Sequence, residues 1–243
     1  VSAPSTDISN SWDVWIYPQP AKVSRGPLGW YREWNPRVAQ EVAEGANAVL
    51  ELPGRQIPGA TRGCFTTVFW NPIMKRQQLA MTMGVLCDPT HPALLGFPTE
   101  AHSNWQWWDV LRASRVLDLD SLQPRPGNIV RMIDSFIGNR CLSVLFEARM
   151  GKGRILVTSL DLSSDLHTRR GANQLRLSLE AYVISSSFHP TIELGVEDLD
   201  RLVALHQQEP KRETRDEVIA RFDRSHVHGA DAPASRGTHD DSI

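Results

Sequence analysis

Residues 142–160, LSVLFEARMGKGRILVTSL, decide the fold class of this chain. Two strand-like runs, Leu142–Arg149 and Arg154–Leu160, flank the segment MGKG, whose two glycines suit a tight turn. Both runs are mostly apolar, and Ile129–Phe136 before them is a further strand candidate. The pattern predicts an antiparallel β-hairpin, and the same MGKG lacks the spacing of a phosphate-binding loop.

Upstream of the hairpin, the order strand, helix, strand predicts a parallel βαβ unit. Ser11–Pro18 alternates in polarity and is expected to be the first strand. A helix is expected over Pro36–Gly45, because Asn35 suits the N-cap and Pro36 the first helical position. Ala48–Leu52 is then the second strand. The sequence predicts an α/β fold with helices on both faces of a mostly parallel sheet that carries the antiparallel hairpin.

The rest of the chain divides into an α/β domain at 1–190, a helical appendage at 191–224 and a disordered tail at 225–243. The tail has almost no apolar residues to bury, so deleting it should leave stability nearly unchanged. Residues 88–104 form a long irregular stretch, of a kind that is often functional or interface-forming. The other expected elements are strands within 65–70 and at 79–87 and 115–119, and helices at 105–114, 168–185, 196–207 and 214–223.

Composition excludes several classes of function. The formal net charge of −2 over 243 residues favours neither nucleic acid nor an anionic membrane as partner. No apolar run reaches the roughly 18 residues of a membrane span. The three cysteines, Cys64, Cys87 and Cys141, form no CxxC pair and are expected to be buried thiols. No cofactor or metal is expected, and the opening VSAPSTD is not a signal peptide.

The tryptophans of NWQWWD are the most unusual feature of the sequence. Exposed tryptophans stack on sugars or anchor protein interfaces, whereas buried ones fill a core or an inter-domain seam. At about 100° per helical residue, Trp105 and Trp108 share a face and Trp107 points elsewhere. We therefore expect Trp105 and Trp108 to pack into the domain. Trp107 is then the better candidate for an exposed surface, and Trp105 and Trp107 are the two residues named for a carbohydrate-binding or interface site.

Candidate catalytic groups lie in the same region but lack a complete pattern. Glu100 and His102, with His91 nearby, could form an acid/base pair or bind a metal, but no third ligand of known spacing accompanies them. Hydrogen bonds that order the loop are the favoured role. A glycosidase needs two facing carboxyl groups. The candidates are scattered along the chain: Glu100, Asp134, Glu147, Asp161 and Asp165.

Cys64 is the candidate for a nucleophilic thiol. An amidotransferase-like enzyme carries its cysteine on a tight strand-to-helix elbow, with a histidine and a glutamate as partners. Here the flanking residues are Gly63 and Phe65, and Asp165 and His167 do not form a His-x-Glu arrangement. Cys64 is therefore expected not to be a nucleophile.

Four stretches together resemble the C-terminal region of bacterial family 2 glycoside hydrolases of the β-galactosidase type. They are NSWDVWIYP (10–18), FTTVFWNPI (65–73), LCDPTHPALLGFPTEAHSNWQWWD (86–109) and EARMGKGRILVTSLDLSSDL (147–166). The resemblance covers about Ser11 to Phe188 and implies a flavodoxin-like or class I amidotransferase-like three-layer sandwich with a degenerate nucleophile site. It implies that the catalytic glutamates lie in a separate barrel, so no catalytic residue carries over to this chain.

The resulting hypothesis is a non-catalytic accessory or assembly domain of a family 2 glycoside hydrolase, periplasmic or extracellular. Its expected partners are other domains or subunits of that hydrolase, or a carbohydrate, with no nucleic acid and no membrane. One alternative is a stand-alone carbohydrate-active enzyme with a cleft near Glu100, His102 and Trp107, with Glu147 and Asp161 as further candidates. The other alternative is a divergent amidotransferase-like hydrolase that uses Cys64.

Overall fold

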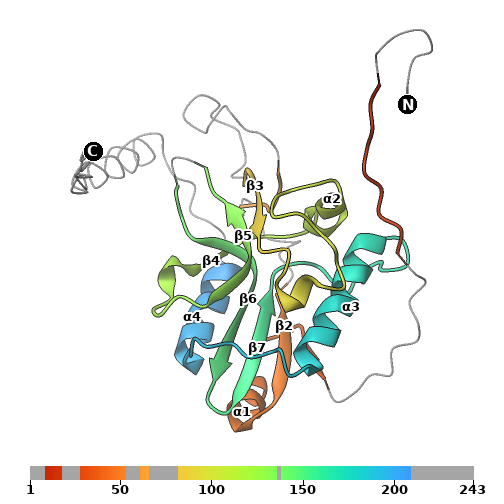
Figure 1. Ribbon diagram of the computed structural model, residues 1–243. Helices are drawn as coiled ribbons and strands as arrows, with labels where there is room; N and C mark the ends of the chain where they lie inside the picture. The colour runs from red at the N-terminus through yellow and green to blue at the C-terminus, as the bar shows by residue number, and fades with distance from the viewer. Residues whose placement is uncertain (1–8, 18–27, 53–60, 66–81, 136–137, 209–243) are drawn as a thin grey trace, which may run out of the picture.

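The computed structural model of the protein describes residues 9–17, 28–52, 61–65, 82–135 and 138–208. Figure 1 shows a twisted central sheet with helices on both faces. Its strands are β1 Gly29–Tyr31, β2 Asn47–Glu51, β3 Gly84–Cys87, β4 Leu117–Asp118, β5 Gly127–Ile133, β6 Leu142–Met150 and β7 Gly153–Thr158. The helices are α1 Pro36–Glu44, α2 Gln106–Leu111, α3 Arg170–Ile184 and α4 Val196–Gln207, with short 3-10 helices at Pro92–Leu94 and Leu119–Ser121.

The described strands form one mixed sheet in the order β1-β2-β7-β6-β5-β3, with β4 also paired to β6. The pairs β1–β2 and β2–β7 are parallel, and the pairs that involve β6 or β3 are antiparallel. The hairpin is confirmed, because Met150 pairs with Gly153 across its turn. The expectation of a mostly parallel sheet is wrong, since β6 pairs antiparallel with β4, β5 and β7, and β5 pairs antiparallel with β3. The fold is therefore α/β with a mixed, open sheet.

The βαβ unit is confirmed, but its first strand is β1 and not Ser11–Pro18. In the structure, residues 11–17 are extended and belong to no strand. Their apolar side chains at 12, 14 and 16 are exposed and the segment is not part of the sheet, so the alternation alone does not produce pairing. The strand β1 has only three residues, too few for a period to stand out in the sequence.

Helix α1 follows the local signals of its sequence. The Asn35 side chain accepts a hydrogen bond from the Val38 backbone N–H at 3.1 Å, which caps the first turn. Val38 and Val42 are buried on one face. Gly45 ends the helix at φ +130°, a backbone conformation that L side chains rarely adopt.

The sheet separates two hydrophobic layers. One contains the inner faces of α2 and α3, and the other contains those of α1 and α4. Helix α4 lies in the segment predicted as a helical appendage, and it packs into the same core as α1 through Leu199, Leu202 and Val203. The predicted helix 214–223, the tail 225–243 and most of the FTTVFW segment lie outside the described residues.

Candidate functional site

The short helix α2 reverses the expected orientation of its tryptophans. Trp107 is fully buried, whereas Trp105 is 67 % exposed and Trp108 is 56 % exposed. Trp105 and Trp108 share a face as expected, but the prediction that this face meets the core is wrong. Trp107 packs edge-on against Phe97, with ring centroids 5.2 Å apart. Its Nε1–H donates a hydrogen bond to Thr99 Oγ1 at 2.8 Å, so the buried indole is satisfied.

On the outer side of α2, the exposed rings of Trp105 and Trp108 form a cluster with the partly buried Phe65. The Phe65 centroid lies 6.2 Å from that of Trp105 and 5.9 Å from that of Trp108. Trp105 and Trp108 are 6.4 Å apart with an interplanar angle of 61°. All three contacts are edge-to-face, which is the arrangement that aromatic quadrupoles favour. We call this group the aromatic cluster.

The carboxyl ends of parallel strands are where open α/β sheets usually bind ligands, and here that edge carries Glu51. The Glu51 side chain is fully buried. Its Oε2 accepts hydrogen bonds from Trp30 Nε1 at 2.7 Å and from Ser163 Oγ at 2.6 Å. Its Oε1 lies 3.6 Å from Arg32 Nε. The Arg176 guanidinium stacks over the Trp30 ring at 4.2 Å, so these groups connect β1, β2 and α3.

A second polar network lies where β7 leads into α3, around the almost fully buried Arg169. Its Nη1 donates to the backbone carbonyls of Asp161 at 2.8 Å and Ser164 at 3.1 Å, and its Nη2 donates to the Asp109 carbonyl at 3.1 Å. Its guanidinium also lies 3.5 Å from the Asp109 carboxylate and 3.7 Å from that of Asp161. Arg169 therefore ties α2 to the carboxyl end of β7.

Asp161 is held ionised by this second network. Burial opposes ionisation, but hydrogen bonds from the Ser164 and Ser163 backbone N–H groups outweigh it. Together with the nearby Arg169 charge, these bonds hold the pKa of Asp161 below its usual range. The enclosed carboxylate therefore stabilises the loop that leads from β7 into α3.

Sequence reasoning missed Glu51 and Arg169. The available signal was weak: a carboxylate inside the otherwise apolar run AVLEL is unusual, because buried charges need partners. Those partners come from distant parts of the chain, and the sequence alone does not identify them.

The other carboxylates named from the sequence lie apart or form internal pairs. Glu147 is on β6 opposite Leu156, where it accepts a hydrogen bond from the Tyr182 hydroxyl at 2.6 Å, whereas Asp161 follows the end of β7. Asp134 accepts from Arg140 Nε at 2.8 Å. Burial raises the pKa of Asp134, but the Arg140 contacts reverse the effect and lower it. Asp165 is exposed in a turn with φ +52°.

The loop groups Glu100, His102 and His91 make the loop-ordering contacts that the sequence predicts. Glu100 Oε2 accepts from Asn104 Nδ2 at 3.3 Å and lies 3.7 Å from His102 Nε2, with both side chains largely exposed. His91 Nδ1 accepts from the Ala93 backbone N–H at 3.2 Å. Among the described residues, no group of three or more His, Cys, Asp or Glu side chains could hold a metal ion.

The three cysteines are free thiols, as expected. The Cys64 thiol donates to the Thr82 carbonyl oxygen at 3.0 Å, and the Cys64 backbone N–H donates to Thr82 Oγ1 at 2.8 Å. Cys64 and Cys141 are half-buried, so full burial holds only for Cys87. Burial raises the pKa of the Cys87 thiol to about 11, which keeps it protonated and unreactive.

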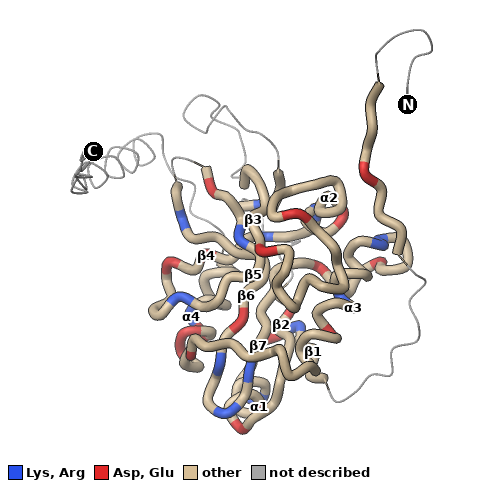
Figure 2. Tube along the Cα trace, in the orientation of Figure 1, with Lys and Arg blue, Asp and Glu red and all other residues tan. Residues whose placement is uncertain are grey.

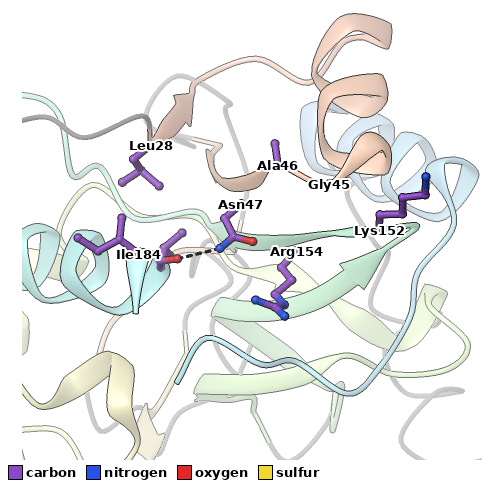
Figure 3. A pocket seen from close by; sticks show the side chains of 8 residues that line it. Leu28, Gly45, Ala46, Asn47, Lys152, Arg154 and Ile184 are labelled. Carbon is purple, nitrogen blue, oxygen red and sulfur yellow. Dashed lines mark hydrogen bonds between the residues drawn. The ribbon is translucent and has the colours of Figure 1, made fainter. Parts of the chain in front are cut away.

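Away from these networks, a pocket of about 480 Å³ opens at the amino ends of β2 and β7 (Figure 3). Lys152 and Arg154 line one side, and Leu28 and Ile184 line the other. The Asn47 side-chain amide donates to the Val183 carbonyl oxygen at 3.1 Å and closes part of the floor. Over the described trace as a whole, acidic and basic residues are interspersed (Figure 2).

His206 makes stability depend on pH. Burial, followed by the charge of Arg115, lowers its pKa to about 4. Its Nε2 lies 3.0 Å from the Leu52 carbonyl oxygen, and its buried Nδ1 has no hydrogen-bond partner among the described residues. A protonated ring would therefore bury an unpaired N–H group.

We expect the contribution of neutral His206 to the free energy of unfolding to be complete above about pH 6.5. It should decrease as the pH falls from about 6.5 to about 4. The unfolded state binds the proton first, and the loss reaches about 3 kcal/mol. Urea unfolding at a series of pH values measures it, with His206→Gln as the control. If the free energy of unfolding of His206→Gln decreases between pH 6.5 and 4 as steeply as that of the wild type, other groups cause the effect.

One family model matches residues 30–204, and its description is a domain of unknown function, DUF8487. A search of curated proteins finds no match. None of the helices in the described ranges has the length and apolar character needed to span a bilayer.

Proposed function

The chain belongs to the DUF8487 family, a domain of unknown function, and we propose that it is a non-catalytic accessory or assembly domain of a family 2 glycoside hydrolase. The observation that carries this proposal is the exposed aromatic cluster on α2. Trp105 and Trp108 expose most of their rings, and the partly buried Phe65 packs edge-on against both. Exposed tryptophans that cluster in this way are typical anchors of protein interfaces.

The geometry of the cluster favours a protein partner over a sugar. A sugar chain stacks on aromatic faces that lie flat along one surface, whereas these rings meet at 61° to 78°. Steeply inclined rings form a ridge that fits an apolar groove in a partner. Arg169 donates to the backbone carbonyl of Asp109, the residue after Trp108, so its network anchors the helix that carries Trp108.

The candidate carboxylates favour a structural role over catalysis. Glycoside hydrolysis needs one carboxylic acid that stays protonated and a second carboxylate across a cleft. Asp134 and Asp161 instead have lowered pKa values and internal hydrogen bonds. Trp107, expected in the alternative hypothesis to line a sugar cleft, is fully buried. These observations support an assembly role more than a stand-alone hydrolase.

The purified chain should not hydrolyse a panel of aryl glycosides. Titration with simple sugars should leave the fluorescence of its exposed tryptophans without a saturable change. Trp105→Ala and Trp108→Ala report on the cluster, and Trp34→Ala, an indole in the α1/α4 layer, serves as the control. Turnover that Glu100→Gln abolishes would overturn the proposal in favour of an enzyme. A saturable fluorescence change that disappears in Trp105→Ala would identify a carbohydrate-binding site instead.

A further inference from the structure

The described N-terminal segment, residues 9–17, runs away from the domain as an extended arm (Figure 1). Trp12 is 61 % exposed, Val14 79 % and Ile16 91 %. Because these residues alternate along an extended backbone, their side chains point to one side of the arm. A strip of three large apolar side chains in water is the pattern of a segment that packs against another surface.

The root of the arm lies beside the helix that carries the aromatic cluster. The Tyr17 ring stacks on Phe97 with centroids 6.5 Å apart, and Phe97 packs against Trp107 of α2. From Tyr17 outward, the six extended residues 11–16 can span roughly 20 Å. The arm can therefore reach past its own domain to the same end of a neighbouring molecule.

The exposed apolar area is large enough for a specific interface. A fully buried tryptophan contributes roughly 150–250 Å². The arm side chains and the aromatic cluster of one chain together expose on the order of 700 Å², so two chains would bury about 1,400 Å² if both surfaces were covered. That area lies within the range of stable protein–protein interfaces.

We propose that the chain forms a twofold dimer in which the arm of each copy covers the aromatic cluster of the other. The inference rests on the proposed assembly role of the cluster and names a second copy of the chain as the partner. A reciprocal exchange is self-complementary, since one arm and one cluster are present on every copy. It covers the exposed side chains of Trp12, Val14 and Ile16 on one copy and those of Trp105 and Trp108 on the other.

Sedimentation velocity of the full chain, over concentrations reaching about 100 µM, tests the dimer. The wild-type protein is expected to sediment as a dimer, and Val14→Asp in the arm and Trp105→Ala in the cluster as monomers. The matched control is Ile184→Asp. Ile184 is 67 % exposed but lies at the far end of α3, so its substitution should leave the dimer intact. Circular dichroism verifies that each variant is folded.

Mixing the two monomeric variants distinguishes arm-to-cluster contact from pairing of two arms. One variant keeps an intact cluster and the other an intact arm, so the mixture should associate at concentrations where each variant alone is monomeric. A monomeric wild-type chain, a dimer that withstands Val14→Asp, or a mixture that stays monomeric would each overturn the inference. None of these results bears on glycoside turnover or sugar binding, so the proposed function stands or falls separately.

Discussion

Replacing Trp107 by alanine is expected to lower the free energy of unfolding by about 3–5 kcal/mol, as for other large buried aromatic residues. The indole is fully buried and packs edge-on against Phe97, so its removal leaves a cavity that rigid neighbours cannot fill. It also removes the hydrogen bond that the indole donates to the partly buried Thr99. Urea unfolding followed by circular dichroism measures the loss.

Trp108→Ala is the matched control, because it removes the same side chain from the same helix. Trp108 is 56 % exposed and lies in the aromatic cluster, so we expect its substitution to cost less than about 1 kcal/mol. A larger loss of unfolding free energy in Trp108→Ala than in Trp107→Ala would show that Trp108, and not Trp107, faces the core.

Arg169→Ala is expected to destabilise the protein by about 3–5 kcal/mol, the range found when one partner of a buried ion pair is removed. The substitution removes the Arg169 charge that lies 3.7 Å from the buried Asp161 carboxylate. It also removes the Arg169 hydrogen bonds to the backbone carbonyls of Asp161, Ser164 and Asp109. Thermal and urea unfolding at neutral pH measure the effect.

Arg170→Ala serves as the control, because the neighbouring arginine is exposed and its loss should change stability by no more than about 0.5 kcal/mol. Arg169→Lys should restore only part of the stability, since an ammonium group cannot reproduce the planar fork that reaches several carbonyls. Full stability in Arg169→Ala would show that the Asp161 network contributes little. Because Arg169 also contacts Asp109, its loss should loosen α2 and the aromatic cluster.

Several elements were determined by the sequence because their signals are local. The cap formed by Asn35 and Pro36 and the stop at Gly45 fixed helix α1 to within a residue. The two glycines of MGKG, with apolar runs on either side, fixed the β6–β7 hairpin. Helix α4 begins and ends at the residues that its pattern predicted, Val196 and Gln207. Each of these signals depends on neighbours a few residues away.

The remaining features were decided only by the tertiary structure. The 100° helical period correctly placed Trp105 and Trp108 on one face of α2, but it does not say which face the sheet will cover. The alternation in Ser11–Pro18 predicted a strand, but residues 11–17 belong to none, because a strand forms only where a partner edge is available. The burial of Glu51 depends on Trp30, Ser163 and Arg32, whose contacts exist only after the chain has folded. Local sequence sets conformation through nearby backbone and side-chain groups, whereas burial and pairing depend on residues that folding brings together from distant positions.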